Sequence, residues 1–145
     1  MASIISDLWE NETLPVKSGV YFSDGRSIEI RLESFPAPTI EIGCEFNFTE
    51  FYSRNKDELT SIDCLKILQL SSGGVCCVGE GGYGSEGFIS RLDEDGNLVW
   101  VIYSEKSNPF IDIFEIDDGY VVAKSSARYA LKIALDNPIK IGLCE

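Results

Sequence analysis

Two stretches of sequence that lie 46 residues apart decide the fold. Residues 65–77 read LKILQLSSGGVCC, and residues 111–123 read IDIFEIDDGYVVA. Each stretch is an apolar alternating run, a polar turn with glycine and a second apolar run, which is the pattern of two antiparallel strands joined by a short turn. The two stretches align without a gap, so the chain contains an internal repeat.

The repeat continues beyond these two hairpins. Residues 88–96 (FISRLDEDG) align with residues 130–138 (ALKIALDNP), now 42 residues apart, so the second copy has a middle loop that is four residues shorter. Four short strands in each copy are typical of a propeller blade. We therefore predict an all-β domain of antiparallel four-stranded blades, with one blade over residues 62–103 and a degenerate terminal blade over residues 108–142.

Two motifs in these copies resemble blades of bacterial β-propellers of the quinoprotein-like and kelch-like types. In those blades a DGGY-like turn follows the inner strand, and a K/R-L-D-x-x-G-N-x-x-W segment joins the outer strands. Here residues 117–123 read DDGYVVA and residues 87–100 read GFISRLDEDGNLVW. The last blade departs from the pattern, with Asn137-Pro138 in place of Asp-Gly and Ile141-Gly142 in place of the tryptophan. The resemblance implies a blade and no particular activity.

The length of the chain limits the number of blades. The smallest closed propeller has about four blades, and four repeats of 46 residues exceed the 145 residues present. We therefore expect a single domain, residues 1–145, that forms a partial propeller of about three blades. Such a half-propeller is open or is closed by its own N-terminal strands.

Residues 1–60 are expected to supply further strands. Residues 19–22 and 27–32 flank the turn Ser23-Asp24-Gly25-Arg26 and predict a hairpin. Apolar alternation continues from Thr39 to Phe48 as one strand or a bent pair of strands. Because proline cannot donate a backbone hydrogen bond to a sheet, residues 35–38, which contain two prolines, are predicted to form a connection.

Two short helical segments are also predicted. Asn55 and Glu58 have the spacing of a capping box, which predicts a helix that begins at Asn55 and has at most two turns. Residues 3–12 place Ile5, Leu8 and Trp9 at helical spacing and predict another short turn of helix. Neither segment is long enough to determine the fold.

The composition restricts the possible functions. The chain has 24 acidic and 12 basic residues, a formal charge of −12 and no histidine. This excess of carboxylates repels nucleic acid and anionic lipid, and the missing histidine removes Ser-His and Cys-His catalysis. The five cysteines lack CxxC spacing and are expected to be free, buried thiols. We therefore expect no enzyme activity, no cofactor and no metal.

Two motifs could carry ligand chemistry but have simpler interpretations. Asp93-Glu94-Asp95-Gly96-Asn97 places carboxylates at alternate positions, as calcium sites do, but an Asp-Gly hairpin turn explains it. Residues 79–87 contain five glycines, but the segment has no lysine, and its Glu80 and Glu86 would repel a phosphate. It is therefore predicted to be a long flexible loop and not a phosphate site.

The blade scheme gathers acidic and aromatic residues on one face of the molecule. That face is predicted to bind a partner, because tyrosines serve as packed anchors and carboxylates attract a basic protein. The opposite face is the second choice, with Asp93, Glu94, Asp95, Asp117, Asp118 and Asp136. The predicted binding residues are Tyr52, Asp57, Glu58, Glu80, Tyr83, Glu86, Tyr103 and Glu105.

In size, charge and truncated blade architecture the chain resembles immunity proteins of bacterial contact-dependent growth inhibition and related toxin–immunity systems. This resemblance implies a cytoplasmic inhibitor that binds a basic toxin as a monomer in a 1:1 complex, and we expect the toxin to be a nuclease. The alternative is a structural or carbohydrate-binding module of the propeller type that closes by oligomerising.

Overall fold

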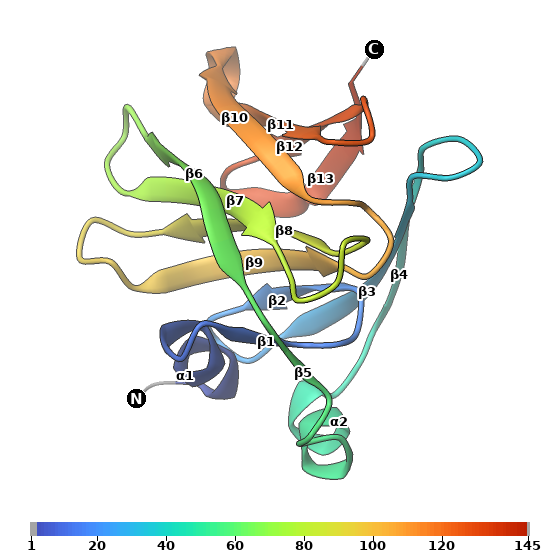
Figure 1. Cartoon of the computed structure of the whole chain (residues 1–145). Helices are drawn as coiled ribbons and strands as arrows, with labels where there is room; N and C mark the ends of the chain where they lie inside the picture. Colours follow the sequence, from blue (N-terminus) through green and yellow to red (C-terminus); the bar gives the residue numbers. More distant parts are fainter. Residues whose placement is uncertain (1–2, 145) are drawn as a thin grey trace.

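The computed structural model describes residues 3–144 and has three layers (Figure 1). The middle layer is a seven-stranded sheet in the order β4-β3-β2-β9-β8-β7-β6. A four-stranded sheet in the order β10-β11-β12-β13 packs on one side of it, and two short helices with a small β1–β5 ribbon cover the other side. All pairings between these strands are antiparallel, so the all-β prediction is confirmed.

The helices are α1 (Ile4–Glu10) and α2 (Phe48–Arg54), and a single 3-10 turn, η1, covers Asp117–Gly119. The strands are β1 (Thr13–Pro15), β2 (Gly19–Phe22), β3 (Ser27–Glu33), β4 (Thr39–Glu45), β5 (Leu59–Ser61), β6 (Asp63–Gln69), β7 (Val75–Glu80), β8 (Gly87–Leu92), β9 (Leu98–Ser104), β10 (Phe110–Ile116), β11 (Tyr120–Ser125), β12 (Ala130–Ala134) and β13 (Asn137–Leu143).

The two copies of the repeat correspond to two four-stranded meanders, β6–β9 and β10–β13. Their first turns are equivalent, since Gly73 and Gly119 both have positive φ angles, of 101° and 79°. The two meanders also stack with equivalent positions in contact. Lys66 of β6 forms an ion pair with Asp112 of β10, 46 positions later, and the Ser71 N–H donates to the Glu115 carboxylate at 2.9 Å.

The N-terminal strands extend the first meander. The predicted hairpin is present, with Tyr21 of β2 paired to Ser27 of β3, and residues 35–38 connect β3 to β4. The other edge of β2 pairs with β9, where Phe22 lies opposite Trp100. Because β2–β4 complete this sheet instead of forming a separate blade, the described residues do not show a three-blade propeller, and no sheet among them is closed.

The prediction of a helix that begins at Asn55 was wrong. Helix α2 precedes that residue, and its N-cap is Asn47, whose side chain accepts a hydrogen bond from the Glu50 N–H at 3.0 Å. Asn55 is the C-cap. Phe48, the first helical residue, is buried in the core, so tertiary packing selects the earlier start. Strand β4 accordingly ends at Glu45, before the alternating pattern does.

The predicted turn of helix at residues 3–12 is confirmed as α1. Ser3 caps it by accepting a hydrogen bond from the Ser6 N–H at 3.3 Å, and Ile5 and Leu8 are buried. Spacing of three to four residues places both side chains on one face of the helix. That face covers the seven-stranded sheet on the side opposite the C-terminal sheet.

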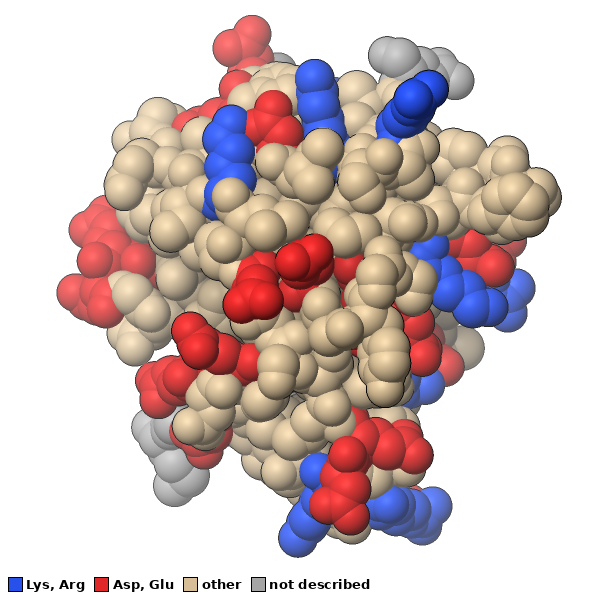
Figure 2. Space-filling model, in the orientation of Figure 1, with Lys and Arg blue, Asp and Glu red and all other residues tan. Residues whose placement is uncertain are grey.

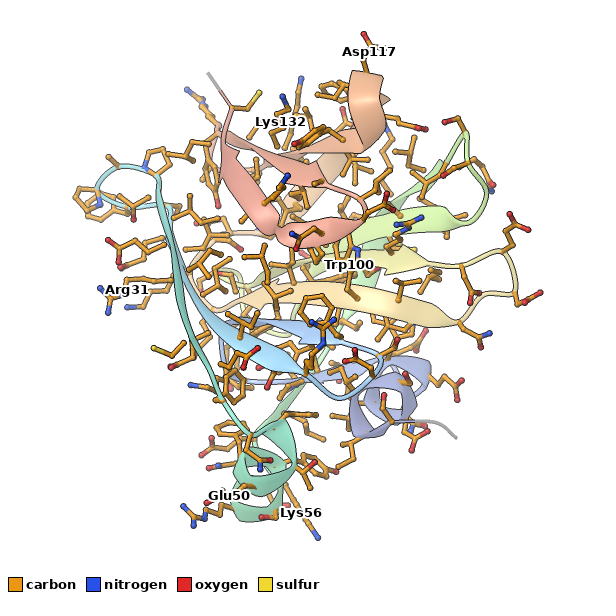
Figure 3. The ribbon with its side chains drawn as sticks, turned by 180° about the vertical axis from the view of Figure 1, so that it is seen from behind. Arg31, Glu50, Lys56, Trp100, Asp117 and Lys132 are labelled. Atoms are coloured by element: carbon orange, nitrogen blue, oxygen red, sulfur yellow. The ribbon has the colours of Figure 1, made fainter. Side chains whose placement is uncertain are left out.

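Two apolar cores hold the three layers together. Between the sheets, alternate residues such as Val20, Ile89 and Ile102 meet Ile113, Val121 and Leu131. On the other side of the seven-stranded sheet, Tyr21, Phe88 and Val101 meet α1, α2 and β1. Trp100 lies between the sheets (Figure 3), and its indole N–H donates at 2.9 Å to the carbonyl of Leu135 in the β12–β13 turn.

Candidate functional site

Glu86, predicted to bind a partner, lies in the interior and is only 2% exposed. One of its carboxylate oxygens, Oε1, accepts hydrogen bonds from the Thr60 hydroxyl at 2.9 Å and from the Tyr83 N–H at 2.8 Å. The other, Oε2, accepts one from the Tyr103 hydroxyl. Glu86 therefore fastens the β7–β8 loop to β5 and β9, and the prediction that it is a surface residue was wrong.

Tyr103 is likewise buried, with an exposed fraction of 1%, so its assignment to the surface was also wrong. Burial raises the pKa of its phenol, and the hydrogen-bonded Glu86 carboxylate raises that pKa further. The phenol therefore stays protonated and donates to the carboxylate. The glycine-rich segment is not a free loop, since the Gly82 N–H also donates to Thr60 Oγ1 at 2.8 Å.

The six other predicted binding residues fall into two groups. Tyr52, Asp57 and Glu58 lie on α2 and on the connection to β5, where Asp57 and Glu58 are exposed and Tyr52 is half-buried against Phe48. Glu80, Tyr83 and Glu105 lie at the ends of β7 and β9, and Tyr83 is 73% exposed. The loops of the second group touch, because the Asn108 N–H donates to the Ser85 carbonyl at 2.8 Å.

A seventh residue belongs with the second group and was missed. Asp63, the first residue of β6, is paired directly with Glu80 of β7. Side chains at directly opposed positions of an antiparallel pair lie about 5 Å apart, and like charges there are destabilising. Neither carboxylate is in an ion pair within residues 3–144. We call Asp63, Glu80, Tyr83 and Glu105 the acidic end; Figure 2 shows red groups across this face.

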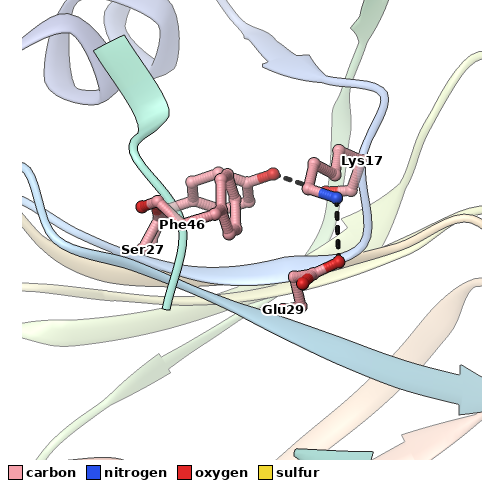
Figure 4. Close-up of polar contacts among 5 residues, drawn as sticks. Lys17, Ser27, Glu29 and Phe46 are labelled. Carbon is pink, nitrogen blue, oxygen red and sulfur yellow. Dashed lines mark hydrogen bonds and ion pairs between the residues drawn. The ribbon is translucent and has the colours of Figure 1, made fainter. Parts of the chain in front are cut away.

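Lys17 lies near this end in space, because the Glu105 N–H donates to the hydroxyl of the adjacent Ser18 at 2.9 Å. Its own ammonium group is already engaged (Figure 4). Its ammonium group pairs with the Glu29 carboxylate at 3.1 Å and lies 4.8 Å from the centre of the Phe46 ring. The Tyr21 hydroxyl donates to the Lys17 carbonyl at 2.5 Å, and the Ser27 hydroxyl donates to the Phe46 carbonyl at 2.8 Å. These contacts join the segment before β2 to the segment after β4. The charge of Glu29 is balanced by the Lys17 ammonium group.

On the face that was the second choice for partner binding, the aspartates stabilise turns and form an ion pair. The Asp93 carboxylate accepts hydrogen bonds from the Asp95 and Asn97 N–H groups, each at 2.9 Å, which stabilises the β8–β9 turn. Asp136 pairs with Arg91 at 3.0 Å. The side chain of Asp118 lies outside the described part of the structure. In that part, no three Cys, Asp or Glu side chains are arranged to hold a metal ion.

A pocket of about 430 Å³ lies between α1 and the β8–β9 turn. It is lined by Ser3, Ser6, Trp9, Glu10, Ser23, Asp93, Gly96, Asn97 and Leu98. No lysine or arginine lines it, so it is unsuited to phosphate or other anions. All five cysteines are free thiols, and Cys76 and Cys77 are buried, as predicted. The prediction of burial was wrong for Cys44, Cys64 and Cys144, which are exposed.

Comparisons of the chain with protein-family models, with curated proteins and with solved structures found no match. Neither helix of the described chain has the length and apolar character needed to cross a membrane.

Proposed function

We propose that this chain is an inhibitor of the immunity-protein type, which binds a basic toxin domain, a nuclease, and blocks its active site with the acidic end. A nuclease must present a cationic groove to the phosphates of its substrate. The carboxylates of Asp63, Glu80 and Glu105 would occupy that groove in place of phosphate, and Tyr83 would be the packed anchor.

The observation that carries this proposal is the direct pairing of Asp63 with Glu80. Two like charges held side by side cost folding energy, and a cation placed between them from outside would relieve that cost. A lysine or arginine of a partner fits this position, since one guanidinium can bind two carboxylate oxygens. The neighbouring ring of Tyr83, which is 73% exposed, supplies apolar contact area beside the charges.

Charge also favours rapid capture of a basic partner. Residues 1–119 contain 22 acidic and 8 basic residues, so the acidic end belongs to a strongly negative part of the molecule. Complementary fields of this kind raise association rates by about 10- to 1,000-fold at low salt. The inhibitor would act as a monomer in the cytoplasm, where its target would otherwise cleave nucleic acid.

The test is a charge reversal with a matched control. In Asp63→Lys/Glu80→Lys the acidic end loses two carboxylates, and Glu94→Lys/Asp95→Lys makes the same change of charge in the β8–β9 turn. A basic nuclease domain is first isolated from the source cells by pull-down with the wild-type chain at low salt. Each variant is then co-expressed with that domain, and growth and association rate are measured at low and high salt.

We expect the first variant to lose protection and to associate at least about tenfold more slowly, while the control keeps both properties. Loss of protection only in the control would move the site to the β8–β9 turn. If the wild-type chain gives no protection at all, the proposed function is incorrect.

We further infer that the two stacked meanders are related to propeller blades. The contact between Lys66 and Asp112, equivalent positions of the two copies, supports this relation, because successive blades of a propeller stack with their strands in the same order. The chain would then be a propeller fragment whose first blade is widened by β2–β4.

A further inference from the structure

The C-terminal sheet differs in charge from the rest of the molecule. Residues 120–145 contain four basic and two acidic residues, against 8 and 22 in residues 1–119. Seven of the twelve Lys and Arg residues form ion pairs with Asp or Glu in the described part of the chain. The five others are Lys56, Lys124, Arg128, Lys132 and Lys140, and four of these belong to β11–β13 and their turns.

The strand register places two of these lysines on the outer face of the sheet, away from the first sheet. Val122 of β11 pairs with Phe114 of β10 on one side and with Lys132 of β12 on the other. Lys124 pairs with Asp112 and Ala130 in the next row of the same face. The inner face of this sheet is apolar, because its side chains form the core between the two sheets.

Lys124 and Lys132 each lie over an aromatic ring. The Lys124 Nζ is 5.5 Å from the centre of the Phe114 ring, and the Lys132 Nζ is 4.5 Å from that of Tyr120. These contacts hold the aliphatic stems flat on the sheet and leave the charged ends in water. Phe114 remains 38% exposed. Figure 2 shows blue side chains over the upper part of the molecule, where β10–β13 lie, and Lys132 extends from this sheet in Figure 3.

Two acidic residues of β10, Asp112 and Glu115, are already engaged. Asp112 accepts a hydrogen bond from the Lys66 ammonium group and one from the Ile113 N–H at 2.9 Å. Glu115 belongs to the inner side and binds the N–H and hydroxyl of Ser71. Lys124 faces the Asp112 carboxylate across the strand pair and shares it with Lys66. Lys132 pairs with Val122 and Gly142 and has no ion-pair partner in the described part of the chain.

We propose that the outer face of the C-terminal sheet is a docking site for an acidic polypeptide segment of a partner protein. The segment would place carboxylates on Lys124 and Lys132 and an apolar side chain on Phe114, the exposed ring of this face. A nucleic acid strand fits less well, because it would extend beyond this small sheet toward the acidic remainder of the molecule. The site does not depend on the function proposed for the acidic end.

The probe for this site is a short fluorescein-labelled peptide rich in Glu with a central Leu, and its binding to the full chain is measured by fluorescence anisotropy. An oligothymidylate of equal charge is the second probe. The variant Lys124→Glu/Lys132→Glu is compared with Lys56→Glu/Lys106→Glu, which changes the charge equally but lies outside the C-terminal sheet. Circular dichroism verifies that both variants are folded.

We expect the peptide to bind the wild-type chain in a salt-dependent manner and the Lys124→Glu/Lys132→Glu variant at least about tenfold more weakly, with the control unchanged. Tighter binding of the oligothymidylate than of the peptide would overturn the proposal in favour of a nucleic acid. Absence of binding at low salt, or equal weakening in both variants, would also overturn it.

Discussion

At the scale of single residues, Glu86 has the largest structural role among the residues first predicted to bind a partner. Its carboxylate accepts three hydrogen bonds, from the Thr60 and Tyr103 hydroxyls and the Tyr83 N–H, in a site closed to water. A charge is tolerated there because several donors surround it. The consequence is that residues 81–86 are fixed in place, and with them the exposed ring of Tyr83.

Replacement of Glu86 measures this role. We expect Glu86→Ala to lower the free energy of unfolding by about 2–4 kcal/mol, since three buried donors lose their acceptor. Glu105→Ala, which removes an exposed carboxylate, should change it by less than about 0.5 kcal/mol. Urea unfolding of both variants provides the measurement, and equal stability of the two would show that the Glu86 contacts are weak.

At the scale of elements, the turns of the repeat depend on glycine in the left-handed region. Gly119 has a φ of 79° with open space around its Cα, so a side chain there meets strain but no clash. We expect Gly119→Ala to destabilise the protein by about 1 kcal/mol. Gly142→Ala, at a site with open space and no left-handed backbone, is the matched control and should be close to neutral. Equal melting temperatures of the two variants in thermal unfolding would contradict this account.

The elements that could be predicted from the sequence are those that a short, continuous run of residues specifies. The β2–β3 hairpin, the turns of the two meanders and α1 each follow from a short run of residues that repeats at the period of a strand or a helix. The pairing of β2 with β9 was not predicted, because nothing in residues 19–22 specifies a partner some eighty residues away. Helix α2 was misplaced because two asparagines, Asn47 and Asn55, could both cap a helix, and the burial of Phe48 decides between them.

The candidate site was predicted less well than the fold. Alternation along a strand tells which side chains share a face, but it does not tell which face another layer will cover. Tyr103 and Glu86 were therefore placed on the surface, although β5 and the segment around α2 cover that side of the sheet. Asp63 was missed because its importance lies in its partner, Glu80, and becomes visible only with the register of β6 and β7.

At the scale of the whole molecule, buried thiol and phenol groups make the free energy of unfolding depend on pH in the alkaline range. Burial raises the pKa of the Cys76 and Cys77 thiols from 9.0 to about 12, and that of the Tyr129 phenol from 10.0 to about 12. The unfolded chain would release these protons at lower pH than the folded one. The stabilisation is therefore complete below pH 9 and is lost as the pH rises toward 12.

We expect the free energy of unfolding to fall above about pH 9, with each such group adding a slope of up to about 1.4 kcal/mol per pH unit. Denaturant unfolding at a series of alkaline pH values measures this decline. The variant Cys76→Ala should show a shallower decline than the wild-type chain. An unchanged slope in that variant would exclude Cys76 as a contributor.

The pairing of β2 with β9 also sets an order of events during synthesis. Residues 19–22 leave the ribosome early, yet the strand that they must join, residues 98–104, is made only after two thirds of the chain. Until then the β2–β3 hairpin has one unpaired edge, and the middle sheet cannot be completed. Contacts between such distant segments slow folding, so we expect the nascent chain to stay incompletely folded until residue 104 has emerged.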